Sequence, residues 1–284
     1  MADHRSTSPG PATAGWRRVR SAPLRRQQLA WALSAVAVLV TAACAGPTGS
    51  AAPASSAATP AGPALINGTT IDRAIPASVL DLPFVDAAGR AVNLASLHGR
   101  TLVVADFLTT CQEICPMTSV NVRDLADALI KAGQPSVTLL EITVDPERDD
   151  PSRLAAYRAL FGAPRPNWIM LTGTSSSVAA LWKFLGVGYF TTPPASPAPT
   201  DWLSGRPLTY DVSHQNVVIV IDGQGHERWL VTGTPATNHE DPPPTLKSFL
   251  SQDGRQNLSS PEGPVWTTSD VLSALARVTG QPIG

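Results

Sequence analysis

Residues 101–116 read TLVVADFLTTCQEICP, and this stretch decides how the folded part of the chain is organised. Its first seven residues are almost all apolar or β-branched, which is typical of a strand buried inside a sheet. Two cysteines follow at positions 111 and 115, and beyond Pro116 apolar residues recur at helical spacing. The sequence therefore predicts a buried strand, a short turn that carries both cysteines, and a helix.

Strands and helices alternate after this helix, and such an order predicts parallel neighbouring strands covered by helices on both faces. Near the C-terminus, two apolar runs flank a glycine-containing turn, as in an antiparallel hairpin. The Pro-rich stretches 191–207 and 241–244 are expected to be loops. The expected strands are 84–94 (two short strands around a turn), 137–144, 168–171, 216–222 and 227–232, and the expected helices are 151–161, 177–185 and 269–278.

The composition excludes a nucleic-acid surface and a disulfide-stapled scaffold. The chain has 284 residues, a formal net charge of -1 and three cysteines. Six arginines and one acid lie in residues 1–43, so the rest of the chain is net acidic and lacks the basic patch that binds phosphates. A chain of this length buries enough apolar area to fold without a disulfide framework.

The N-terminal segment predicts export. The uncharged run 29–43, LAWALSAVAVLVTAA, is short for a membrane span of about 20 residues. The residues Thr41-Ala42-Ala43-Cys44 resemble a bacterial lipobox, in which Cys44 becomes the lipidated first residue, although Thr41 stands where such boxes usually carry Leu. We therefore expect a signal peptide over 1–43 and a lipoprotein on the outer face of the bacterial cytoplasmic membrane. An uncleaved membrane anchor is the alternative.

The segment that follows is expected to be a tether. Residues 45–65 carry no charge and consist almost entirely of Ala, Pro, Gly, Ser and Thr. Such a composition cannot bury enough apolar area to offset the entropy lost on ordering. We expect residues 44–79 to form a lipidated cysteine with a flexible tether and 80–284 to form one folded domain, in which Cys111 and Cys115 are the remaining cysteines.

The spacing of Cys111 and Cys115 places both sulfurs on one side of a helical turn. Their position at a helix N-terminus favours thiolate, so both thiols are expected to be acidic and reactive. Such a pair can bind one metal ion or form one disulfide. A purely stabilising disulfide is the simpler alternative, but it closes only a short loop and so constrains the unfolded chain little.

A soft metal site built on two thiolates needs a further ligand, and imidazole is the usual addition. His214 stands in an expected loop, 210–215, directly before a buried strand, where an α/β fold presents its chemistry. This position alone does not separate a metal ligand from a hydrogen-bonding histidine. The other histidines are expected to be solvated, to cap an element, or to leave with the signal peptide: His4, His98, His226 and His239.

Four motifs, in this order, resemble the SCO/SenC family. They are Phe107-x-x-Thr110-Cys111-x-x-x-Cys115-Pro116, Thr143-Val144-Asp145-Pro146-Glu147-Arg148-Asp149, Leu181-Trp182-Lys183-Phe184-Leu185-Gly186-Val187 and Tyr210-x-Val212-x-His214. The resemblance covers roughly residues 80–232. It implies a thioredoxin-like α/β fold whose mixed central sheet is flanked by helices, with an N-terminal β-hairpin extension.

The resemblance also implies a membrane-tethered copper metallochaperone that supports assembly of the binuclear copper centre of cytochrome c oxidase. Its copper ligands would be Cys111, Cys115 and His214, with Cu(I) as the first expectation and Cu(II) as the second. The implied partners are the copper-binding subunit of the oxidase and another copper chaperone or a thiol reductant. Ser213 departs from the Asp that family members frequently carry, and the insertion 191–207 is expected to reshape the partner surface.

The alternative function is a thiol-disulfide oxidoreductase that keeps the oxidase's copper-ligand cysteines reduced, with Cys111 and Cys115 as its redox-active pair. Thioredoxin-type catalysts resemble Cys-x-x-Cys with a proline facing the site. Here three residues separate the cysteines, and no proline lies between positions 210 and 222. A peroxidase is disfavoured because the chain shows no clear pattern of Thr and Arg around a single attacking cysteine. Trp182 and Tyr189 are expected to belong to the core.

Overall fold

The computed structural model describes residues 67–238 and 240–283. The expected signal peptide, Cys44, most of the expected tether and His239 lie outside these residues. Among the residues that are described, no helix combines the length and the apolar character needed to cross a bilayer.

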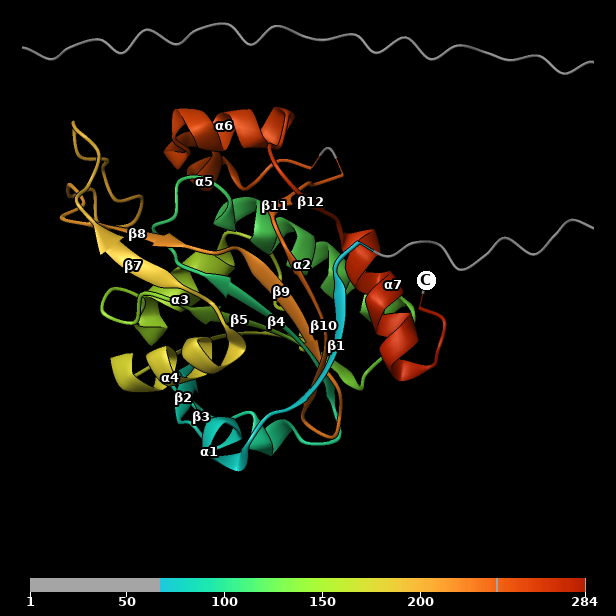
Figure 1. The fold of residues 1–284 in the computed structure, drawn as a ribbon. Helices are drawn as coiled ribbons and strands as arrows, with labels where there is room; N and C mark the ends of the chain where they lie inside the picture. The colour runs from blue at the N-terminus through green and yellow to red at the C-terminus, as the bar shows by residue number, and fades with distance from the viewer. Residues whose placement is uncertain (1–66, 239, 284) are drawn as a thin grey trace, which may run out of the picture. The chain divides into compact units, whose positions relative to one another are not determined.

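A mixed sheet of eight strands forms the centre of the described chain (Figure 1). Its strands are β1 (Thr69–Ala74), β2 (Phe84–Asp86), β3 (Ala91–Val92), β4 (Thr101–Phe107), β5 (Val137–Thr143), β6 (Trp168–Gly173), β9 (Val217–Ile221) and β10 (His226–Thr232). They are ordered β1-β10-β9-β4-β5-β6-β2-β3. The strands β4, β5 and β6 pair in parallel and all other neighbours are antiparallel. The α/β prediction with a mixed sheet is confirmed, and β2 and β3 are the predicted hairpin extension.

Helices cover both faces of this sheet. The helices of the described chain are α1 (Ala77–Leu80), α2 (Cys115–Lys131), α3 (Pro151–Ala159), α4 (Ser175–Leu185), α5 (Pro244–Phe249), α6 (Gln252–Ser259) and α7 (Thr268–Thr279), with a short 3-10 turn at Ala95–Leu97. Two successive right-handed crossovers, from β4 to β5 and from β5 to β6, place α2 and α3 on one face, where α7 packs on α2. The helix α4 lies with α1 on the other face (Figure 1). This is the thioredoxin-like arrangement.

The strand-turn-helix unit predicted from 101–116 is confirmed. Every residue of β4 and of β5 is buried, because helices cover both faces of these central strands. The helix α2 begins at Cys115 with proline in its first turn, where a missing N–H is harmless. After it, Gly133 takes a φ of 63°, which lets the chain turn toward β5. The cysteine turn is thus held between a rigid strand and a rigid helix.

Two predicted boundaries are wrong. The expected tether, 44–79, extends too far, because β1 already pairs with β10 along the edge of the sheet. Its sequence, TTIDRA, is polar and mostly exposed, so it lacks the apolar alternation that would announce a strand. The expected loop 210–215 contains a strand, β8 (Asp211–His214), which pairs with β7 (Tyr189–Thr192). The predicted loop 191–207 therefore begins inside β7.

Candidate metal centre

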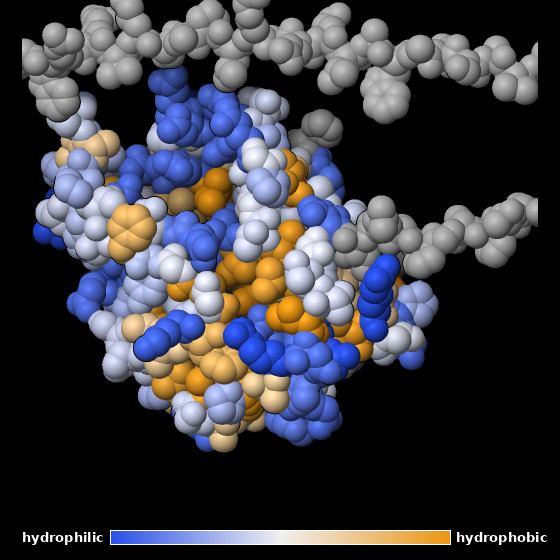
Figure 2. Space-filling model, in the orientation of Figure 1, coloured by the Kyte–Doolittle hydropathy of each residue, from blue (hydrophilic) through white to orange (hydrophobic). Residues whose placement is uncertain are grey.

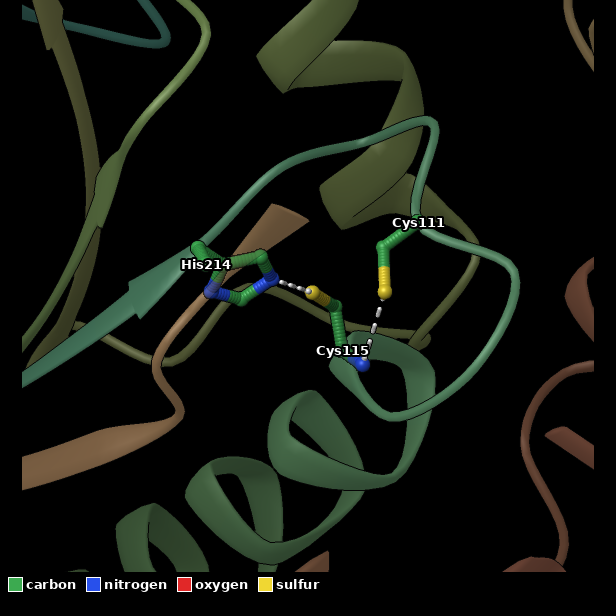
Figure 3. A group of neighbouring side chains, drawn as sticks. All are labelled: Cys111, Cys115 and His214. Carbon is green, nitrogen blue, oxygen red and sulfur yellow. Dashed lines mark hydrogen bonds between the residues drawn. The ribbon is translucent and has the colours of Figure 1, made fainter. Parts of the chain in front are cut away.

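Three elements bring the candidate ligands together. The strand β4 leads into the loop that carries Cys111, α2 begins at Cys115, and β8 ends at His214. The two Sγ atoms and a ring nitrogen of His214 all lie within 4.8 Å of one another. Figure 3 shows the three side chains converging from the loop, the helix and the strand. Among the residues that the structure describes, this is the one cluster of such groups that can hold a metal ion.

The cluster is withdrawn from solvent. Cys111 is 8% exposed and Cys115 is 1% exposed, and the His214 side chain is 4% exposed. The Cys115 backbone N–H donates to Cys111 Sγ at 3.3 Å, so the first turn of α2 supplies a donor to that sulfur. The Sγ atom of Cys115 lies 3.4 Å from Nε2 of His214. Of the two cysteines, Cys111 is the slightly more exposed residue.

A buried carboxylate orients the imidazole. Nδ1 of His214 lies 2.6 Å from Oδ2 of Asp106 and 3.0 Å from the carbonyl oxygen of Gln215. Both neighbours are acceptors, so Nδ1 carries a hydrogen and Nε2 is the nitrogen that faces the sulfurs. The other oxygen of Asp106 accepts the Val217 backbone N–H at 2.7 Å. The sequence did not single out Asp106, because it lies within an apolar strand; a charged residue in such a run was the available signal.

The two thiols have opposite acidities. Hydrogen bonding from Cys115 and the nearby His214 outweigh burial and hold the pKa of the Cys111 thiol well below its usual range. Burial, followed by the Cys111 sulfur, raises the pKa of Cys115 well above its usual range. Burial opposes a charge on His214, but Asp106 outweighs it and raises the pKa of this imidazole. The prediction of two acidic thiols is therefore right for Cys111 and wrong for Cys115.

The second motif fixes the start of the cysteine loop. Asp149 is fully buried, and its carboxylate accepts hydrogen bonds from the backbone N–H of Thr109 at 3.1 Å and from the Thr143 hydroxyl at 2.6 Å. The Thr109 hydroxyl bonds the same carboxylate. Burial raises the pKa of Asp149 to about 6. The motif's last residue thus holds the backbone just before Cys111.

The same motif also holds β8, the strand that carries His214. The hydroxyl of Tyr210 donates to Asp145 Oδ1 at 2.8 Å, and Arg148 donates to the Tyr210 carbonyl oxygen at 2.8 Å. The Arg148 guanidinium lies 3.8 Å from the centroid of the Tyr210 ring, which adds a cation–π contact. The motif therefore ties the strand of the histidine to the loop of the cysteines.

The Pro-rich insertion packs beside the site. Asp201 accepts two hydrogen bonds, of 3.0 and 2.6 Å, from the guanidinium of Arg153, and both residues are buried. The Trp202 indole donates to the Thr109 carbonyl oxygen at 2.7 Å. The insertion, for which a role in shaping the partner surface stays a prediction, therefore supports the backbone two residues before Cys111.

The remaining histidines that the structure describes lie elsewhere. His98 is exposed next to a short 3-10 turn, and His226, which is partly exposed, pairs with Asp72 at 3.0 Å. Both agree with the solvated or capping role that was expected. Trp182 is fully buried, as expected of a core residue, and Tyr189 is partly buried against the core.

Comparison with known proteins gives the family. The SCO1/SenC family model matches residues 77–243, more than half of the chain. The chain belongs to the SCO1/SenC family. The SCO1 protein homolog of Bacillus subtilis is 35% identical over 94 residues, which is 33% of this chain and 48% of that protein. The human mitochondrial SCO2 homolog is 34% identical over 100 residues, 35% of this chain and 36% of that protein.

The chain thus spans about half the length of the Bacillus SCO1/SenC relative and less of the human one. Among solved structures, Arabidopsis thaliana ScoI with copper bound matches with a TM-score of 0.45 and 20% identity, over 62% of this chain and 96% of that chain. Bradyrhizobium japonicum ScoI with copper bound matches with a TM-score of 0.43 and 21% identity, over 64% and 96%.

The donor set in this SCO1/SenC chain fits copper on its own chemistry. Thiolates are soft donors that select Cu(I), and imidazole is a common copper ligand. The three residues predicted as copper ligands are the ones that the fold brings together. His214 has its second nitrogen bonded to a carboxylate, as metal-ligating histidines usually do.

Proposed function

We propose that this chain is a carrier of copper, with Cys111, Cys115 and His214 as the ligands of its cargo. The convergence of these three side chains on one point carries the proposal. Bound copper would receive two thiolates and the Nε2 lone pair of the imidazole. Because Cys115 holds its proton and His214 has a raised pKa, loading the site releases protons to solvent.

The family resemblance supplies the recipient, the binuclear copper centre of cytochrome c oxidase in its copper-binding subunit. A three-ligand site leaves room for a ligand from the recipient to approach the metal. We expect copper to pass to the recipient on the side of the site where Cys111, the more exposed of the two cysteines, lies. The partner that loads the site would be another copper chaperone, and a thiol reductant would keep the two cysteines reduced.

A second candidate is a thiol-disulfide oxidoreductase acting on the oxidase's cysteines. The unequal acidities of the two thiols favour it: Cys111 has the lowered pKa of an attacking thiolate, and Cys115 is the buried partner. Such an activity needs the two sulfurs and does not need the imidazole as a ligand.

Replacing His214 by Ala separates these two functions. A carrier loses a ligand, so Cu(I) affinity in competition with a chelator should fall roughly 100-fold, the equivalent of a few kcal/mol. In cells the variant should lose oxidase assembly, and added copper should restore part of it. The matched control is His98→Ala, an exposed histidine away from the cluster. Full oxidase activity in His214→Ala, with loss in Cys111→Ser, would favour the oxidoreductase.

The location of the protein is part of the proposal. Cleavage before Cys44 and lipidation of its thiol would hold the folded domain at the outer face of the cytoplasmic membrane, next to an integral oxidase. Mass spectrometry of the purified protein tests this, because a lipidated Cys44 terminus is expected. An intact Met1 terminus with a free Cys44 thiol would favour the uncleaved anchor.

A further inference from the structure

The C-terminal segment 244–259, which contains α5 and α6, lies directly against the loop between the two cysteines. This segment follows the last residue matched by the family model. The backbone N–H of Ser251 donates to the carbonyl oxygen of Gln112 at 2.9 Å. Figure 1 shows α5 and α6 beside the loop that joins β4 to α2. We call residues 244–259 the C-terminal strap.

Gly254 is the point of closest approach. A Cβ atom at this position would lie 2.2 Å from the Gln112 carbonyl oxygen and 3.0 Å from Cα of Glu113. Glycine is a poor helix former, and Gly254 lies inside α6 without the positive φ that would require it. The contact with the cysteine loop therefore accounts for glycine at this position.

The strap is fixed at both ends. Before α6, Leu246 and Leu250 are buried in the domain. After α6, Trp266 in β12 (Val265–Trp266) is buried, and its indole donates to the Gly233 carbonyl oxygen at 3.1 Å. The strand β12 also pairs with β11 (Thr234–Pro235). The surface around α6 that is visible at the top of Figure 2 is hydrophilic. Gly254 is the buried residue of this helix, and it lies on the side that contacts the cysteine loop.

We propose that Ser251 and Gly254 are positioning residues that hold the Cys111–Cys115 loop in its open dithiol form. To form a disulfide, the two sulfurs, which lie within 4.8 Å of each other, must come within bonding distance with a narrow range of Cβ positions, and any backbone change that this requires falls on the loop between them. The strap fixes the carbonyl group of Gln112, in the middle of this loop, by one hydrogen bond and one close backbone contact. Releasing it should make closure easier and should loosen the arrangement of the three copper ligands.

The redox part of this inference is independent of copper, and its copper part rests on the proposed function. In a glutathione buffer, the two thiols give two protons and two electrons to glutathione disulfide, forming one protein disulfide and two glutathione thiols. The glutathione ratio at which half of the protein is oxidised then measures how readily the loop closes. Competition with a Cu(I) chelator measures the second effect.

Two variants of the full-length protein test the strap. Gly254→Ala introduces the clash, and Gln252→Ala, at an exposed position of the same helix, is its control. Ser251→Pro removes the N–H donor; the φ of -63° at Ser251 and the ψ of 138° at Leu250 both suit proline. Because the Ser251 hydroxyl also caps α6 at Gly254, Ser251→Ala is the control that removes the cap and keeps the N–H.

We expect Gly254→Ala and Ser251→Pro to favour the disulfide about tenfold more than their controls do, a shift of about 30 mV. Cu(I) affinity should fall about tenfold in the same two variants. Variants that lower thermal stability but leave both readouts at the control values would overturn the inference. If Gly254→Ala does not fold, the Ser251→Pro and Ser251→Ala pair decides. If the redox equilibrium shifts in these variants but the wild-type protein binds no copper, the inference about the strap stands and the proposed copper carrier is rejected.

Discussion

The carboxylate of Asp106 lies 2.6 Å from Nδ1 of His214, and both side chains are buried. Asp106 reaches the histidine from the strand that leads to the cysteines, so one residue connects the two halves of the candidate site. It fixes the ring orientation and leaves Nε2 directed at Cys115. The arrangement also makes the imidazole more basic, which strengthens it both as a base and as a ligand.

Asp106→Asn should weaken copper binding without removing a ligand. Asparagine keeps the shape, but it can offer only one acceptor to the two donors, His214 Nδ1 and the Val217 N–H. Cu(I) affinity should fall roughly 10- to 100-fold, as when other carboxylates behind ligating histidines are replaced. Chelator competition measures this, with the exposed Asp81→Asn as control.

The same variant should lower the pKa of His214. In the wild type this pKa is raised, so the imidazolium's contribution to stability is complete below the unfolded value of about 6.5 and is lost as pH rises through the folded value. Removing the negative charge should move that loss to lower pH, which NMR titration of the ring can follow. An unchanged titration and an unchanged copper affinity would show that Asp106 only supports the strand.

The two thiols should be alkylated at different pH values. The lowered pKa of Cys111 predicts reaction with iodoacetamide well below pH 8.5, and the rate should rise as pH passes upward through that lowered pKa. Cys115, with its raised pKa and 1% exposure, should stay unmodified over this range. Peptide mass spectrometry distinguishes the two sites. His214→Ala should shift the Cys111 profile to higher pH, whereas His98→Ala should not; equal rates at both cysteines would contradict the assignment.

Oxidation should abolish copper binding at this site. The reduced protein is expected to bind one Cu(I), and the disulfide form none, because a disulfide lacks both anionic sulfur ligands. Metal analysis after gel filtration of the two forms gives the stoichiometry. Cys111→Ser, which cannot form the disulfide, should bind copper weakly under both conditions. If the wild type held the same copper content before and after oxidation, Cys111 and Cys115 would not be its ligands.

The strands that are buried on both faces could be predicted from the sequence. The strands β4 and β5 are buried on both faces, so their composition is apolar throughout and announces them. The strands β1 and β8 are mostly polar and neither is buried throughout, so they lack the apolar pattern that announces a strand. The partner of β1 is β10, far along the chain, and the partner of β8 is β7, on the other side of the Pro-rich insertion. A local sequence pattern does not show which distant strand will be the partner, so neither β1 nor β8 could be predicted from the sequence.

In the candidate site, too, some residues could be predicted from the sequence and others could not. The ligands could be predicted because Cys111, Cys115 and His214 have side chains with unusual chemistry at a favourable point of the fold. The residues that position them act through contacts across the chain: Asp106 on β4 and Gly254 on α6. The opposite acidities of the two thiols also depend on distances of a few ångströms within the folded site. Spacing along the sequence does not supply these distances.

A buried glutamate should make stability depend on pH near neutrality. Glu141 on β5 accepts hydrogen bonds from the Ser119 hydroxyl at 2.6 Å and from the Trp168 indole at 2.8 Å. Burial nevertheless raises the pKa of Glu141 to about 7. Because the folded pKa exceeds the unfolded value of about 4.3, this residue's stabilising contribution is complete below that value and is lost as pH rises through about 7.

Glu141→Gln should therefore stabilise the protein at pH 8 and change little at pH 5. Glutamine resembles the protonated acid, since its oxygen can accept from Trp168 and its amide can donate to the rotatable Ser119 hydroxyl. The gain at pH 8 should be about 1–3 kcal/mol in the free energy of unfolding, measured by urea denaturation. Glu147→Gln, at an exposed position, is the control. An equal loss of stability at both pH values would mean that the ionised carboxylate is needed by its two donors, and that burial does not neutralise it.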